Sequence, residues 1–298
     1  MFSFHKTKDS VGVARVLGSK RQVYYDDSII DKPPKHVVDS HDAMLVSYGP
    51  RTQKRGTRTV DEPMPPKPSK QVGASLEVYG ADKMSISPDR RADDNQRHAL
   101  FITAPPGSGK SVLINEYATA WKQLFPQGKI IVFSAKKNDP SFTFPYQHMD
   151  AEADDKVFTV DDIVDWQTNN DKEHTTPFLV IYDDTSTLSS LAVKRVMASL
   201  DSLVKVGRSH FVDVIFTNHE INDSARTKTM HSNATHHIFF PSTHRHKIAE
   251  SLRTRFGLPK HAIVHILGRH DRWFCLTMQA PCWYISPTKV CTLDHLTG

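Results

Sequence analysis

The chain has 298 residues, enough for one large α/β domain with an extension or for two modest domains. Its 38% hydrophobic content can fill a core, and its net charge of +5 allows affinity for polyanions without establishing it. The first ten residues lack the apolar region of a secretion signal, and no apolar run approaches the ~18 residues of a transmembrane helix. The three cysteines form no CxxC pair, so we expect no disulfide framework and a reducing, intracellular compartment.

Residues 1–96 are predicted to be a basic, partly irregular N-terminal extension. Eight of the 18 prolines lie there, and residues 61–70 have the composition of a linker. Two short segments, 21–25 and 43–48, favour strands. The basic cluster of Arg51, Lys54, Arg55 and Arg58 contains no acidic residue. It is either part of a solvated tail or an arm that contacts nucleic acid or a partner protein.

A phosphate-binding loop is predicted where the segment HALFITAPPGSGKS joins a strand, residues 99–103, to a helix, residues 112–125. Gly107 and Gly109 let backbone amides surround phosphate oxygens. Lys110 supplies a charge for the outer phosphates, and the Ser111 hydroxyl can hold Mg²⁺. We therefore expect ATP and Mg²⁺ as ligands. The expected nucleotide-binding residues are Ala104, Pro105, Pro106, Gly107, Ser108, Gly109, Lys110, Ser111 and Val112.

Apolar runs and helical patterns alternate over the rest of the chain, residues 97–298, which we expect to be the ATPase domain. The predicted strands are 130–134, 178–182, 211–218, 238–240 and a terminal hairpin of 272–278 with 282–286. The predicted helices are a short one near 161–166, then 188–204, 246–256 and 260–267. This alternation is typical of an α/β fold with a doubly wound, mainly parallel sheet.

Two carboxylates end the buried strand FLVIYDD. In open parallel sheets ligands bind at the carboxyl ends of the strands, so Asp183 and Asp184 are predicted to lie beside the phosphate loop. We expect Asp183 to hold the magnesium ion through water and Asp184 to orient or deprotonate the attacking water.

Two further residues flank the strand 211–218. Asn218, at its end, is a candidate to hold the lytic water or the γ-phosphate. Arg208 precedes the strand, and ten residues of extended chain span about 33 Å, so Arg208 and Asn218 cannot serve one nucleotide within one subunit. A catalytic Arg208 would have to act on a neighbouring subunit. The alternative is a solvated arginine at a helix end.

The order of these motifs, from the phosphate loop through KIIVFS and FLVIYDD to GRSHFVDVIFTN, resembles the FtsK–HerA superfamily of ring-forming DNA-translocating ATPases. Within it, residues 97–286 look most like the genome-packaging ATPases of poxvirus-type large DNA viruses. The resemblance implies catalytic roles for Lys110, Asp184, Arg208 and Asn218, although the family usually carries Gln where Asn218 stands. It also implies that the Asn218 strand lies between the strands of the phosphate loop and of Asp183.

The same resemblance implies a homo-oligomeric ring around double-stranded DNA and a role in packaging a viral genome. The partners would then include capsid or membrane-associated virion proteins, and the protein would act at the assembly site in the host cell and could enter the virion. Another DNA translocase or helicase, cellular or plasmid-borne, is an alternative. A slow nucleotide-binding assembly switch is a third hypothesis.

Overall fold

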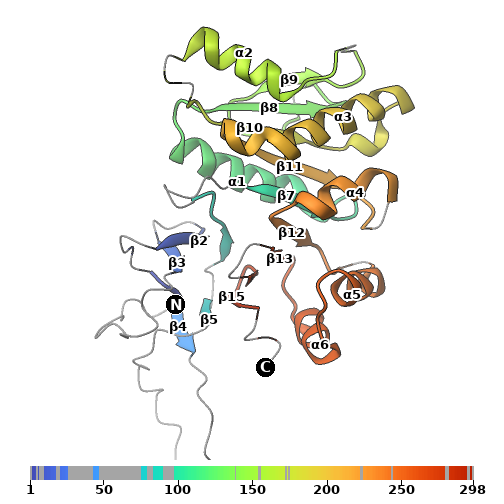
Figure 1. Cartoon of the computed structure of the whole chain (residues 1–298). Coiled ribbons are helices and arrows are strands. Elements are labelled where there is room, and N and C mark those ends of the chain that lie inside the picture. The colour runs from blue at the N-terminus through green and yellow to red at the C-terminus, as the bar shows by residue number, and fades with distance from the viewer. Residues whose placement is uncertain are drawn as a thin grey trace, which may run out of the picture.

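The structure is a computed structural model, and it places most of the chain after residue 96 together with separate segments before it (Figure 1). The described residues are 2–4, 6, 10–17, 21–25, 43–46, 75–78, 83–89, 97–137, 139–153, 156–171, 173, 175–221, 224–242, 244–278, 282–293 and 296. The basic cluster of residues 51–58 and the linker at 61–70 lie outside these ranges.

An eleven-stranded sheet forms the centre of the molecule, in the order β4-β5-β15-β14-β13-β12-β7-β11-β10-β8-β9. The six strands from β12 to β9 pair in parallel. They are β7 (Ala99–Thr103), β8 (Lys129–Ser134), β9 (Gln147–Asp150), β10 (Phe178–Tyr182), β11 (Val212–Asn218) and β12 (His236–Phe239). The strands β7, β10, β11 and β12 are buried along their whole length, as expected of strands covered on both faces.

Helices cover both faces of the parallel strands (Figure 1). On one face α1 (Lys110–Leu124) packs its apolar side chains against Leu100, Ile102 and Ile215. On the other face lie α2 (Val160–Asn170), α3 (Ser190–Val206) and α4 (Ser224–Asn233). The predicted doubly wound, mainly parallel fold is therefore confirmed.

The place of β11 sets the strand order. It pairs with β7 on one side, with Asn218 opposite Thr103, and with β10 on the other, with Val212 opposite Phe178. The strand that ends in Asn218 thus lies between the phosphate-loop strand and the Asp183 strand, as the family resemblance implies.

An antiparallel half extends the sheet beyond β12. The predicted hairpin is present as β13 (Phe274–Thr277) and β14 (Trp283–Ile285), and it continues through β15 (Lys289–Thr292), which the sequence did not predict. The helices α5 (Arg245–Thr254) and α6 (Lys260–Gly268) cover one face, and their Ile248 and Ile266 belong to one apolar cluster with Phe274 of β13.

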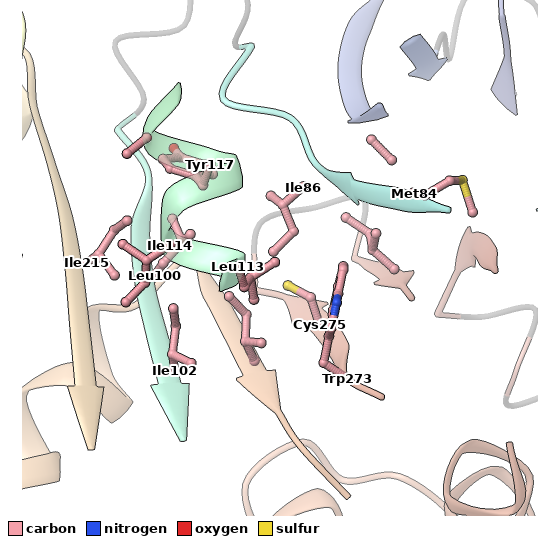
Figure 2. Close-up of a cluster of buried hydrophobic side chains, with 14 of the residues drawn as sticks. Met84, Ile86, Leu100, Ile102, Leu113, Ile114, Tyr117, Ile215, Trp273 and Cys275 are labelled. Carbon is pink, nitrogen blue, oxygen red and sulfur yellow. The ribbon is translucent and has the colours of Figure 1, made fainter. Parts of the chain in front are cut away.

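The described parts of residues 1–96 contribute to both sheets. The strands β5 (Ser75–Val78) and β4 (Ala43–Val46) continue the large sheet from β15. A second sheet has the order β1-β3-β2-β6, formed by β1 (Phe2–Ser3), β2 (Val11–Val16), β3 (Gln22–Tyr25) and β6 (Met84–Ile86). Figure 2 shows Met84 and Ile86 of this sheet in one apolar cluster with Leu113 of α1 and Trp273.

These segments therefore share a core with the parallel strands of the large sheet. No helix within the described ranges has the length and apolar character that crossing a bilayer requires.

Candidate nucleotide-binding site

The loop between β7 and α1 has the conformation that phosphate binding requires. Gly107 and Gly109 have φ angles of 73° and 106°, in the left-handed region that favours glycine. Residues Pro106 to Val112 line a cavity of about 880 Å³ at the carboxyl end of the parallel strands. The amino terminus of α1 opens into it, and such a terminus attracts anions through its free amides and its dipole.

Not all predicted loop residues line this cavity. Pro106, Gly107, Ser108, Gly109, Lys110, Ser111 and Val112 do. Ala104 is 2% exposed and contributes its carbonyl oxygen, which lies 3.4 Å from Lys110 Nζ. Pro105 O accepts a hydrogen bond from the amide of Ser108, which closes the turn.

Lys110 is the charged group at the base of the loop. Its Nζ lies 3.2 Å from His219 Nδ1, and its side chain lines the cavity although the residue is only 7% exposed. Burial lowers the pKa of Lys110, and the nearby Asp184 and Asp183 oppose that shift. A lysine held this way offers a fixed positive charge to phosphate oxygens.

The two carboxylates that follow β10 differ in their surroundings. Asp183 is 3% exposed and accepts a hydrogen bond of 2.9 Å from Thr217 Oγ1. Burial and the neighbouring charge of Asp184 raise the pKa of Asp183. Asp184 has a left-handed backbone, with φ 51°, and its side chain faces the cavity. The pair thus presents one carboxylate within the structure and one to the cavity.

Lys136, which follows β8, forms an ion pair with Asp184, with 3.0 Å between Nζ and Oδ2. Burial acts to raise the pKa of Asp184, but the hydrogen bond from Lys136 and the charges of Lys110 and Lys136 outweigh it, so this pKa lies below its usual value. Asp184 is therefore ionised at neutral pH, as a group that orients water must be.

His219 is a site residue that the sequence analysis missed. Its Nε2 lies 3.2 Å from Asp184 Oδ1, and its Nδ1 lies 3.2 Å from both Lys110 Nζ and Ala104 O. Asn218 is 5% exposed, and its side chain is bonded to the carbonyl of Glu220 and the amide of His219. The side chain from the end of β11 that lines the cavity is thus His219, while the role expected of Asn218 stays a prediction.

Arg272 is a second missed residue. Its Nε donates a hydrogen bond of 2.7 Å to the carbonyl of Ser108, and its side chain lines the cavity. The sheet explains this position, because Phe274 pairs with Phe239 and Phe239 pairs with Thr103, so the start of β13 lies beside the end of β7. No sequence pattern connects this arginine with the phosphate loop.

Arg208 lies at the amino-terminal ends of the parallel strands, opposite the carboxyl ends where this cavity opens. It belongs to a short 3₁₀ helix, η3 (Gly207–His210), which precedes β11, and it is exposed. Burial lowers the pKa of Arg97 to about 10, Asp213 opposes this shift, and Arg208 adds to it, so Arg208 lies near the beginning of β7. The expectation that Arg208 and Asn218 occupy opposite strand ends is confirmed.

The oxygen donors of the cavity fit a magnesium ion. Ser111 carries a hydroxyl in the first turn of α1, and Asp184 adds a carboxylate to the cavity lining. Asp183 is buried next to Asp184 and would reach the ion through water. Hydroxyl, carboxylate and phosphate oxygens, with water, are the ligands that Mg²⁺ prefers. Within the described ranges, no three or more His, Cys, Asp and Glu side chains are grouped so that they could hold a metal ion.

Comparison with known proteins places these features beside several viral and bacterial proteins. No protein-family model matches the chain. Over 188 residues the chain is 27% identical to the uncharacterized protein V3 of Sputnik virophage, covering 62% of this chain and 73% of that protein. The chain resembles the P-loop ATPases of the FtsK–HerA superfamily. Its own motifs and strand order carry that resemblance.

Three solved structures are among the structural matches to this chain. The genome-packaging NTPase B204 of Sulfolobus turreted icosahedral virus 2, with ATP-γS, has a TM-score of 0.40 and 13% identity over 64% of this chain and 96% of that one. The pCW3 conjugation coupling protein TcpA has a TM-score of 0.44 and 12% identity, over 95% of this chain and 77% of that one. The cytoplasmic domain of the secretion ATPase EccC of Thermomonospora curvata has a TM-score of 0.40 and 13% identity, over 66% of this chain and 25% of that one.

Proposed function

We propose that the protein is a magnesium-dependent ATPase that moves double-stranded DNA, and that it packages a viral genome. The observation that carries the first part is the meeting of three groups at one cavity: the amides of the phosphate loop, the ammonium of Lys110 and the carboxylate of Asp184. Together they supply what phosphoryl transfer needs, namely positioning and charge stabilisation.

The residues divide the work by location. The loop amides and Lys110 would hold the phosphates, and the hydroxyl of Ser111 with the carboxylate of Asp183 would hold the magnesium ion. When bound, that ion supplies positive charge between the outer phosphate oxygens. Asp184 would orient the attacking water and accept its proton.

His219 would position two of these groups. The ring lies between Lys110 and Asp184, within 3.2 Å of each. A neutral ring with its proton on Nε2 donates to Asp184 and accepts from Lys110 through Nδ1. We infer that His219, at the end of β11, holds the side chains of Lys110 and Asp184 in fixed positions relative to each other. It is therefore a positioning residue.

Arg208 would act on the nucleotide of a neighbouring subunit. It lies at the far edge of its own sheet, and two exposed apolar side chains flank it, Val206 and Phe211, which are 50% and 38% exposed. A ring that brings this edge to the next phosphate loop would cover the apolar side chains and deliver the guanidinium.

The role in DNA packaging rests on likeness rather than on the site. B204, with 13% identity, is a genome-packaging NTPase, and the 27% identical V3 protein belongs to a virophage. A viral ATPase acting in the host cell on double-stranded DNA agrees with both. We propose a homo-oligomeric ring because the order of the motifs resembles that of the ring-forming FtsK–HerA ATPases.

A second candidate is a slow nucleotide-dependent assembly switch. The ion pair between Lys136 and Asp184 favours it, because it occupies the carboxylate that hydrolysis would use. The two candidates differ in their response to DNA.

The test is the rate of ATP hydrolysis with and without double-stranded DNA, for the parent and for Lys110→Ala. A matched control is Lys194→Ala, which removes an exposed lysine from α3. A translocase gives DNA-stimulated hydrolysis in the parent and the control and none in Lys110→Ala. Slow hydrolysis that ignores DNA supports the switch, and equal rates in all three proteins refute the site.

A further inference from the structure

A second cavity adjoins the phosphate cavity. It has a volume of about 330 Å³ and shares Gly109, Val112 and Arg272 with the first cavity. The two spaces therefore meet at the first turn of α1. Their shared wall is the guanidinium of Arg272, which lies so close to Gly109 that an added Cβ would be 2.7 Å from its central carbon.

The walls of the second cavity come from several parts of the chain, including Phe240 after β12 and Pro287 before β15. The helix α1 contributes Leu113 and Glu116, and the segment before β13 contributes Trp273. The N-terminal extension contributes Leu17, Lys83 and Met84. Met84, Leu113 and Trp273 belong to one apolar cluster, which Figure 2 shows. The lining also includes the ionisable residues Lys83, Glu116, His270, Asp271 and Arg272. Apolar walls combined with polar groups, at a volume near 300 Å³, are typical of small-molecule sites.

The two cavities differ in the chemistry of their walls. The groups suited to hydrolysis, Asp184, His219 and Lys136, line the first cavity and are absent from the lining of the second. A nucleoside triphosphate held by the phosphate loop must turn its outer phosphate toward these groups. Its other end then extends past Val112 and Arg272.

We propose that the second cavity binds the base of the nucleotide, so that the N-terminal extension is part of the ATP site. The inference rests on the proposed function and deepens it. Leu17, Lys83 and Met84 would close the base pocket from one side and Trp273 from the other. Arg272 would lie between base and phosphates, where a planar guanidinium can both stack and pair with oxygen.

With the C6 edge of the base toward Glu116, the pocket would prefer adenine, which has an amino group at C6, to guanine, which has a keto oxygen there. The carboxyl of Glu116 lines the cavity, and Ser85 of β6 donates a hydrogen bond of 3.0 Å to its Oε2. A carboxylate oxygen accepts a hydrogen bond from the amino group of adenine and repels the keto oxygen that guanine has at the same position. A site built to bond one such group rejects the base that lacks it.

The test compares Mg-ATP with Mg-tripolyphosphate, which carries the phosphates without a base, by calorimetric titration of the full chain. Leu17→Trp fills the base pocket from a half-buried position, and its matched control is Leu191→Trp on the exposed face of α3. We expect Leu17→Trp to weaken ATP binding by about tenfold or more and to leave tripolyphosphate binding unchanged. The control should change neither.

Each outcome separates this inference from the proposed function. A parent that binds neither ligand refutes the ATPase site itself. A Leu17→Trp protein that binds ATP like the parent, or that weakens for both ligands equally, overturns the base pocket alone. If Leu17→Trp does not fold, Lys83→Trp is the substitute, because it introduces the same indole ring into the base pocket from an exposed position. Glu116→Gln should bring ATP and GTP affinities closer together, and an unchanged ratio contradicts the amino-group preference.

Discussion

Arg208 gives the sharpest prediction about assembly. From Val212 to Asn218 the strand β11 rises about 3.3 Å per residue, so its ends lie about 20 Å apart, and Arg208 precedes it by a further 3₁₀ turn. No arginine rotamer spans that distance back to the phosphates. Arg208→Ala should therefore preserve ATP affinity and remove DNA-stimulated hydrolysis, a loss of about 10³–10⁵-fold if the arginine stabilises transferred charge.

Mixing two inactive variants tests whether the arginine acts between subunits. An Arg208→Ala subunit keeps Lys110, and a Lys110→Ala subunit keeps Arg208. In randomly mixed rings with equal amounts of each, about one quarter of the interfaces join an intact phosphate loop to an intact arginine.

The assay is the ATPase rate against mixing ratio at fixed total protein with DNA present. The account predicts a maximum at the equal mixture. A flat line at the level of the parents, with mixed rings verified by pull-down of a tagged variant, refutes the trans role.

Three further predictions, made with five variants, test the site and its support. Asp184→Asn should bind Mg-ATP yet hydrolyse it about 10²–10⁴-fold more slowly, whereas Asp183→Asn should lose affinity for the metal nucleotide; identical behaviour contradicts the division of roles. His219→Ala should lower kcat about 10–100-fold with a smaller change in ATP affinity, and His219→Gln should recover part of the loss. His237→Phe should make the protein less sensitive to acid in urea unfolding at pH 5 and pH 7.

The acid sensitivity follows from burial of His237. Burial, with the charges of His231 and His236, lowers the pKa of His237 from 6.5 to about 3, and neither ring nitrogen has a hydrogen-bond partner among the described residues. Below pH 6.5 His237 binds a proton in the unfolded chain but stays neutral in the folded chain until the pH nears 3. Stability is thus full above pH 6.5 and falls toward pH 3, by about 2 kcal/mol at pH 5 for this residue. A variant as acid-sensitive as the parent contradicts this assignment.

The sequence predicts the parallel half of the fold because its signals are local. The strand FLVIYDD is a buried apolar run ending in acids, and the loop at Gly107–Lys110 joins a strand to a helix. Both the doubly wound sheet and the edge at which the nucleotide cavity opens follow from such runs. The strand order required the family resemblance, because register between strands leaves no trace in a single strand.

The remaining features depend on pairing over long distances. The strands β5 and β15 are four residues each and meet across more than two hundred residues of chain, so neither is distinctive alone. Arg272 reaches the phosphate loop only because β13 returns antiparallel to β12. His219 belongs to no recognisable sequence motif. Its proximity to Lys110 and Asp184 is visible only in the folded structure.

The most direct test of the central claim is steady-state ATP hydrolysis as a function of double-stranded DNA concentration, measured on the parent and on Lys110→Ala at equal, verified folding. The account predicts that DNA raises the rate of the parent until it saturates, and that the variant shows no hydrolysis at any DNA concentration. Hydrolysis by Lys110→Ala at the rate of the parent would contradict it.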